Sequence, residues 1–458
     1  MKPKEKTTLG EKLPFSQKIG ALMAATAAAV ATGYVPNYIN VYYTDTVGVS
    51  IGAIGLILML MKITDGVTDI MMGMIVDRTR TKLGKARPWL LAGGFGLAIS
   101  MLLLFSCPPK FSMAGKIAFC AFFYFLVNPF FGTMVSVTAS AVINLISGDS
   151  KHRAVLGVFS SYGSLLPVLV IGLVVPTLLS AMGENQKTYT MVTLVFVLMA
   201  VVATVVAVAC IRETVSERSM ENLTEKQPVM ESIKELLKNK YFVYLALGTI
   251  CYNLTAAPVA NYYAKYIFGD IGKATLINLP GLLMVFLLPF AIPLVNKIGK
   301  RNSIVIGLGM CVVGHAIMFF ANTNLVVFMI GKTISGISPV PYFVALIPLT
   351  GEICDYALYK SGKPMDGTIS SAASMGGKIG IGLTAGISSL MLQFAGYISS
   401  ADEVFVQQPD SALFMLRILI GVYPAILFAL AAFFFWKIDL EKQGIAQIQQ
   451  ELREKGLR

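Results

Sequence analysis

The chain has 458 residues, of which 55% are hydrophobic and only 14% are charged, and its mean hydropathy is +0.71. This composition leaves too little polar surface for a soluble protein, and many apolar runs reach about 20 residues, the length that crosses a bilayer. The net charge of +12 is spread over separate loops, whereas a nucleic-acid site needs one contiguous basic patch. We therefore expect a protein embedded in the lipid bilayer, with no nucleic-acid partner.

Twelve apolar stretches have the length of a membrane span. They cover approximately residues 18–43, 51–76, 88–107, 114–144, 154–181, 188–211, 241–268, 274–296, 303–321, 325–350, 367–395 and 411–436. A long charged segment follows the sixth stretch and divides the chain into two halves. We predict an all-α membrane protein with an N-terminal six-helix bundle (1–211), a linker with an amphipathic helix (212–240), a C-terminal six-helix bundle (241–437) and a tail (438–458).

Basic residues fall on one side of this predicted topology. They are Lys2, Lys4, Lys6, Lys12, Arg78, Arg80, Lys82, Lys85, Arg87, Lys297, Lys300 and Arg301. The opposite loops at 44–50 and 322–324 contain no lysine or arginine. Because positively charged loops stay on the cytoplasmic side, both termini are predicted to be cytoplasmic.

Three ionisable residues lie inside the second span. Asp65 and Asp69 are one helical turn apart, so their carboxylates project from the same face, and Lys62 precedes Asp65 by three residues. Each such group costs about 2.5–3.5 kcal/mol at membrane depth, so the cluster needs a function or partners. The paired carboxylates, with hydroxyls from Thr68 or Thr133, suit Na⁺; close carboxylates also suit H⁺. We predict a cation-binding site here, and both ions remain open; the alternative is a static salt-bridge network.

Charged turns after the spans echo between the two halves. The turn with Asp77, Arg78 and Arg80 after the second span has a counterpart after the eighth, and the turn after the fourth span matches the one that starts at Asp355 after the tenth. One interpretation is topology and contact with anionic headgroups. The other is a gating role, in which these residues form charge pairs that hold one side of the molecule shut.

Polar and aromatic side chains in the spans are candidates for binding a solute, because a sugar-like ligand needs hydrogen-bond partners beside apolar faces. The candidates are Tyr34, Asn37, Asn40, Asn128, Ser136, Tyr162, Asn253, Lys332 and Phe343. Packing explains Tyr34 and Phe343 equally well. Lys332 is expected either to bind an anionic group or to extend towards the membrane interface.

The six cysteines show no CxxC or metal-ligand spacing, and the chain contains no nucleophile elbow or P-loop. We expect no disulfide framework, no metal site beyond Na⁺, no cofactor and no enzymatic activity.

Several motifs together resemble the glycoside/pentoside/hexuronide:cation symporters, the melibiose permease group of the major facilitator superfamily. The matching stretches are Tyr42-Tyr-Thr-Asp-Thr-Val-Gly, Lys62-Ile-Thr-Asp-Gly-Val-Thr-Asp-Ile-Met-Met-Gly, Gly84-Lys-Ala-Arg-Pro-Trp, Tyr262-Tyr-Ala-Lys-Tyr-Ile-Phe-Gly-Asp, Asp355-Tyr-Ala-Leu-Tyr-Lys and Gly376-Gly-Lys378. The resemblance implies two pseudo-symmetric six-helix bundles with the site between them. It also implies that Asp65 and Asp69 bind the cation and that Lys378 lies near them; with Lys62, it would balance their charge.

The resemblance further implies symport of a glycoside, pentoside, hexuronide or related sugar with Na⁺ or H⁺, in a bacterial inner membrane and by a chain that works as a monomer. It breaks at the family's acidic sugar clamp, where this chain has Ala29, Ser136, Ser140 and Ser160 or Ser161. Two alternatives therefore stay open: a transporter of an anionic or lipid-like solute, and a membrane sensor that transports nothing.

Overall fold

The computed structural model describes residues 13–147, 150–213, 239–361, 366–399, 406–440 and 444–454. The predicted linker helix lies outside these residues, and so do the side chains of Asp77 and Lys378. Within the described part, the regular elements are helices, and ten of them are long and apolar enough to cross a membrane. The chain is therefore a multi-pass membrane protein of the all-α class.

The N-terminal half contains six spans. They are formed by α1 (Phe15–Val41) with the π-helical turn η1 (Tyr42–Thr46), α2 (Ile51–Arg78), α3 (Arg87–Leu104), α4 (Met113–Phe125) with the π-helical turn η2 (Leu126–Gly132) and α5 (Thr133–Ile146), α6 (Ser150–Met182) and α7 (Gln186–Cys210). Within this bundle α1 packs against α6 and α7, and α3 packs against α7. A buried aromatic cluster around Tyr34, Phe105 and Phe196 fills its centre.

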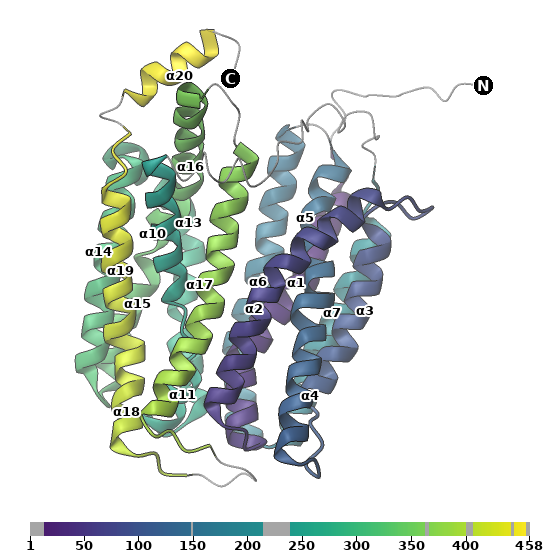
Figure 1. The fold of residues 1–458 in the computed structure, drawn as a ribbon, viewed down its shortest axis with the longest axis vertical. Helices are drawn as coiled ribbons and strands as arrows, with labels where there is room; N and C mark the ends of the chain where they lie inside the picture. Colours follow the sequence, from purple (N-terminus) through teal and green to yellow (C-terminus); the bar gives the residue numbers. More distant parts are fainter. Residues whose placement is uncertain are drawn as a thin grey trace.

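The C-terminal half also contains six helical segments, and four of them include helices counted among the ten that are long and apolar enough to cross a membrane. They are formed by α10 (Lys240–Leu254) with α11 (Ala260–Tyr266), η3 (Ile271–Lys273) with α12 (Ala274–Asn278) and α13 (Pro280–Ile298), α14 (Lys300–Ala321), α15 (Leu325–Ile337) with α16 (Val340–Ser361), α17 (Asp366–Phe394), and α18 (Asp410–Arg417) with η4 (Ile418–Val422) and α19 (Tyr423–Trp436). A further helix, α20 (Ile445–Glu454), packs on α16. Figure 1 shows the two bundles side by side.

Three of the predicted spans are interrupted in the structure, and the eighth has its break at Leu279, between α12 and α13. The seventh span was predicted as one helix over 241–268, but α10 ends at Leu254 and α11 begins at Ala260. Pro258 lies in the gap and has no amide hydrogen with which to continue a helix. The tenth span was predicted to end at residue 350. It breaks instead between Ile337 and Val340, and α16 continues to Ser361.

The two halves meet along α2 and α17 (Figure 1) and also along α6 and α12. A Cβ atom on Gly55, near the start of α2, would lie 2.3 Å from Cβ of Ser389 on α17. Further along the same helix, a Cβ on Gly73 would have no described atom within 4 Å. The two helices therefore touch closely at the end where α2 begins, whereas Gly73 near the other end of α2 has no described neighbour within 4 Å of an added Cβ.

A carboxylate caps the start of α3. Glu213, just after α7, accepts hydrogen bonds from the backbone N–H groups of Lys85 (2.6 Å), Ala86 (3.0 Å) and Arg87 (3.1 Å). Gly84 approaches this carboxylate with a φ of 113°, and a Cβ there would lie 2.5 Å from the carboxyl carbon. Negative charge is favourable at a helix N-terminus, so Glu213 fixes the α2–α3 turn to the end of α7.

Candidate functional site

The carboxylate of Asp65 lies between α2 and α5 and is only 7% exposed. Its Oδ2 atom accepts from Nζ of Lys62 at 3.0 Å, and its Oδ1 atom accepts from the Thr133 hydroxyl at 3.0 Å. Thr133 Oγ1 lies 3.3 Å from Thr68 Oγ1. Four of the residues predicted for the cation site and its charge balance thus form one connected group within the membrane-spanning region.

The local structure explains this grouping. Lys62, Asp65 and Thr68 are spaced three residues apart, which places them on one face of α2. Thr133 directly follows the π-helical turn η2, which contains Pro129. Such turns inside α-helices often occur at functional sites because they change the direction of the following side chains.

The other two residues of the predicted cation site are placed less completely. Asp69 lies one turn after Asp65 on α2, and its side chain is half-buried. Lys378 lies on α17, the helix that packs against α2, but its side chain is outside the described part. A role for Lys378 in charge balance remains a prediction.

A cavity of ≈ 300 Å³ opens in the C-terminal half between α10, α16 and α17. Its lining includes Asn253 and Phe343, two of the predicted substrate residues. Two further lining residues, Tyr252 and Tyr342, were not predicted from the sequence, and their rings stack with centroids 4.1 Å apart. Their position next to Asn253 and Phe343 in the sequence was the available signal. Aromatic faces beside amides and hydroxyls are typical of sites for polyhydroxylated ligands.

The predicted substrate residues on α1 lie elsewhere. Tyr34 is fully buried, and its hydroxyl is 2.9 Å from that of Thr193, which is the packing role that the sequence left open. Asn37 donates to the Gly33 carbonyl, and Asn40 is buried at 2% exposure near the end of the helix. The structure does not bring these three residues to the aromatic cavity.

The predicted residues on η2, α5 and α6 are also separate from that cavity. Asn128 donates to the Tyr124 hydroxyl at 2.7 Å, and the Ser136 hydroxyl donates to the Thr133 carbonyl at 3.3 Å. Of these residues, Ser136 lies nearest in sequence to Thr133 of the cation group. Tyr162 on α6 is 49% exposed.

Lys332 is half-buried on α15, near Cys311 and His315 of α14. It is not among the residues that line the aromatic cavity. No ion pair joins its ammonium group to a described carboxylate. Both roles expected for Lys332, binding of an anionic group and extension towards the membrane interface, therefore stay predictions.

The predicted gating residues lie at the end of the molecule where α2 stops. Arg78 and Arg80 are exposed there. Asp355, on the extension of α16, accepts a hydrogen bond of 2.7 Å from Gln449 of α20. The side chain of Asp77 is outside the described part, so the charge pairs expected for this turn are not tested.

Two six-helix bundles that enclose membrane-embedded charges and a cavity define a transporter of the major facilitator class, not an enzyme. The sequence profile of the MFS/sugar transport protein family matches residues 20–442, and the chain belongs to this family.

Similar proteins agree with this assignment. The uncharacterized symporter YjmB of Bacillus subtilis (strain 168) is 29% identical over 92% of this chain and 91% of its own length. The glucuronide carrier protein homolog of Escherichia coli (strain K12) is 25% identical over 90% and 89%. The crystal structure of a D-xylose-proton symporter matches 93% of this chain and 96% of that chain with a TM-score of 0.66 and 14% identity, which shows a shared fold.

Proposed function

We propose that the protein is a secondary active transporter that couples the movement of Na⁺ or H⁺ to symport of a glycoside, hexuronide or related sugar by alternating access. The observation that carries this proposal is the Asp65 carboxylate, buried at membrane depth and held by Lys62 and Thr133. A charge in this position is costly because desolvation opposes it, and ionisable residues inside membrane spans typically mark ion or substrate pathways. Both termini would lie in the cytoplasm, in a bacterial inner membrane.

In this proposal a cation competes with the Lys62 ammonium for the Asp65 carboxylate. Binding of Na⁺ would use the carboxylate oxygen and the hydroxyls of Thr133 and Thr68, since hard cations prefer oxygen ligands. A proton would instead neutralise the carboxylate directly. Without the cation, the Lys62 ammonium balances the Asp65 carboxylate, so the empty site is close to neutral and can change its exposure to the two sides.

The aromatic cavity is the proposed place of solute binding. Tyr252, Tyr342 and Phe343 offer apolar faces for a sugar ring, and Asn253 offers an amide for its hydroxyls. The names of the similar proteins support this class: one is described as a symporter and another as a glucuronide carrier homolog. Because one chain contains both bundles around the site, we propose that it works as a monomer.

The test is uptake into proteoliposomes with imposed Na⁺ or H⁺ gradients and a panel of labelled neutral glycosides and uronides. The parent protein should accumulate at least one solute with one gradient, and Asp65→Asn should abolish that accumulation. Asp439→Asn is the matched control, because it removes a carboxylate that pairs with Arg301 at 3.1 Å outside the spans. Equal accumulation by Asp65→Asn and the parent would overturn the proposal.

A further inference from the structure

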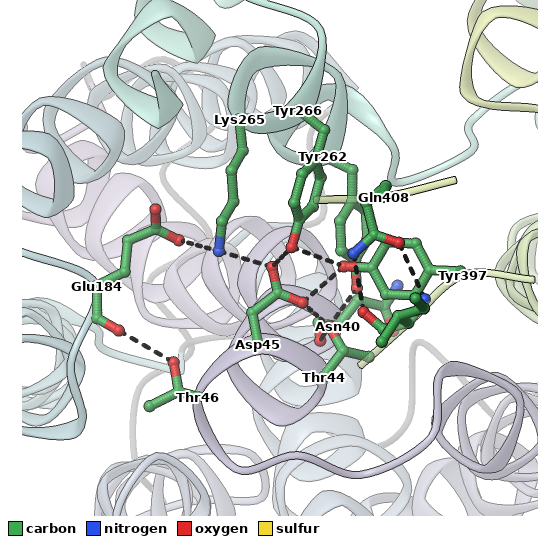
Figure 2. A network of polar contacts seen from close by, with 11 residues as sticks. Asn40, Thr44, Asp45, Thr46, Glu184, Tyr262, Lys265, Tyr266, Tyr397 and Gln408 are labelled. Carbon is green, nitrogen blue, oxygen red and sulfur yellow. Dashed lines mark hydrogen bonds and ion pairs between the residues drawn. The ribbon is translucent and has the colours of Figure 1, made fainter. Parts of the chain in front are cut away.

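Two motifs that the cation and sugar sites leave unused come together in the structure. The first is the π-helical turn η1 at the end of α1, Tyr42–Thr46, in the N-terminal half. The second is the short helix α11, Ala260–Tyr266, in the C-terminal half. They are more than two hundred residues apart in the chain, and Figure 2 shows their side chains directed towards one another.

The centre of this contact is the carboxylate of Asp45, which is 3% exposed. Its Oδ2 atom accepts from Nζ of Lys265 at 2.7 Å and from the Tyr266 hydroxyl at 2.6 Å. Its Oδ1 atom accepts from the hydroxyls of Tyr397 at 2.6 Å and Thr44 at 2.7 Å. Three of the four donors belong to the C-terminal half, so a single N-terminal carboxylate holds α11 and the segment after α17.

Lys265 extends the contact to a second segment of the N-terminal half. Its Nζ atom also lies 2.9 Å from Oε2 of Glu184, in the connection between α6 and α7. The Glu184 carbonyl in turn accepts from the Thr46 hydroxyl at 3.2 Å (Figure 2). The ammonium group therefore bridges two N-terminal carboxylates from one C-terminal helix.

Other polar contacts between the halves lie at the same end. Asn261 on α11 donates to the Asn37 carbonyl at 2.7 Å, and the hydroxyls of Thr44 and Tyr262 are 2.9 Å apart. Ser180 at the end of α6 donates to Asp270 at 2.7 Å. These contacts coincide with the end at which α2 and α17 touch, whereas a Cβ placed on Gly73, further along α2, would have no described atom within 4 Å.

We propose that Asp45, Lys265 and Glu184, with Tyr266 and Tyr397, form a lock that closes the transporter at the end opposite the basic loops and must open to admit solute from that side. Buried ion pairs with satisfied hydrogen bonds suit this task, because removing one partner leaves an uncompensated charge and shifts the balance between states. The lock goes beyond the proposed function, since its opening is measurable without any solute.

The experiment measures the distance between spin labels across the lock end. Met113→Cys at the start of α4 and Asp410→Cys at the start of α18 provide exposed label sites in the two halves, in a background without the six native cysteines that retains its fold. Asp45→Asn and Lys265→Gln should each increase the population with a long label distance. Tyr397→Phe, which removes one hydroxyl donor and little volume, should do so to a smaller extent.

Lys273→Gln is the matched control, because Lys273 lies at the same end and donates to the Phe268 carbonyl of its own half at 2.7 Å. The proposal requires the parental distance distribution in this variant. Parental distributions in Asp45→Asn, Lys265→Gln and Tyr397→Phe, all with parental elution as folded protein, would overturn it. The proposal would also be overturned if Lys273→Gln increased the population with a long label distance as much as Lys265→Gln does.

Discussion

The hydroxyl of Thr133 is the contact that joins the two sides of the cation group, because it donates to Asp65 from a different helix. A hydrogen bond to a charged acceptor contributes about 1.5–3 kcal/mol. Thr133→Val should therefore raise the half-saturating concentration of the coupling cation about tenfold or more in gradient-driven uptake. Thr138→Val is the control, since Thr138 on the same helix donates to the Met134 carbonyl. An unchanged cation dependence in Thr133→Val would remove Thr133 from the site.

At the scale of residues, contacts within one helix were predictable and those between distant segments were not. The i, i+3 spacing of Lys62 and Asp65 predicted that they share one face of the second span, and in the structure their charged groups lie 3.0 Å apart. Asp45 and Lys265 gave no such signal, because each lies at the end of a span where a charge normally contacts water. Their pairing depends on the arrangement of the two halves, and nothing in local spacing encodes it.

The start of α3 depends on a residue from another element, and this makes a prediction about the α2–α3 turn. Glu213→Ala removes the acceptor for three backbone N–H groups, which then have only solvent to bond. Amide hydrogen exchange in a peptide covering residues 79–90 should become faster by about tenfold or more, as expected for the loss of about 1.5–3 kcal/mol. Glu454→Ala, at an exposed position on α20, should leave that peptide unchanged. Parental exchange in Glu213→Ala would show that the cap does not hold the turn.

Hydropathy located the spans of this chain but not their interruptions. The averaging that finds a 20-residue apolar stretch hides a local break, so 241–268 appeared as one helix despite Pro258. The same averaging set the end of the tenth span at 350, although α16 continues to Ser361 as a less apolar extension that contacts α20. Of the nine solute candidates, Asn253 and Phe343 line the aromatic cavity and the other seven do not. Spacing gives the face of a helix, not the neighbour that the face meets.

For the whole molecule, two glycines on α2 should favour opposite states when enlarged. Gly55→Val places carbon where Ser389 already lies, with 2.3 Å between the Cβ atoms, and should therefore force the lock end apart. In the present state a Cβ at Gly73 meets no described atom within 4 Å, so Gly73→Val is tolerated there, but it should hinder closure of the opposite end. With the labels on positions 113 and 410, Gly55→Val should lengthen the distance and Gly73→Val should keep it short, and both should slow uptake. Identical distributions in the two variants would contradict this description of the motion.

The charge count of the lock has a consequence for what approaches the transporter. One lysine, Lys265, stands against two carboxylates, Asp45 and Glu184, so the closed contact carries an excess of one negative charge. Separation of the halves would take Lys265 away and leave both carboxylates exposed to water on the N-terminal side of the solute path. A patch of negative charge concentrates cations from the medium, so the same residues that seal the path would, once apart from Lys265, supply the coupling ion to it.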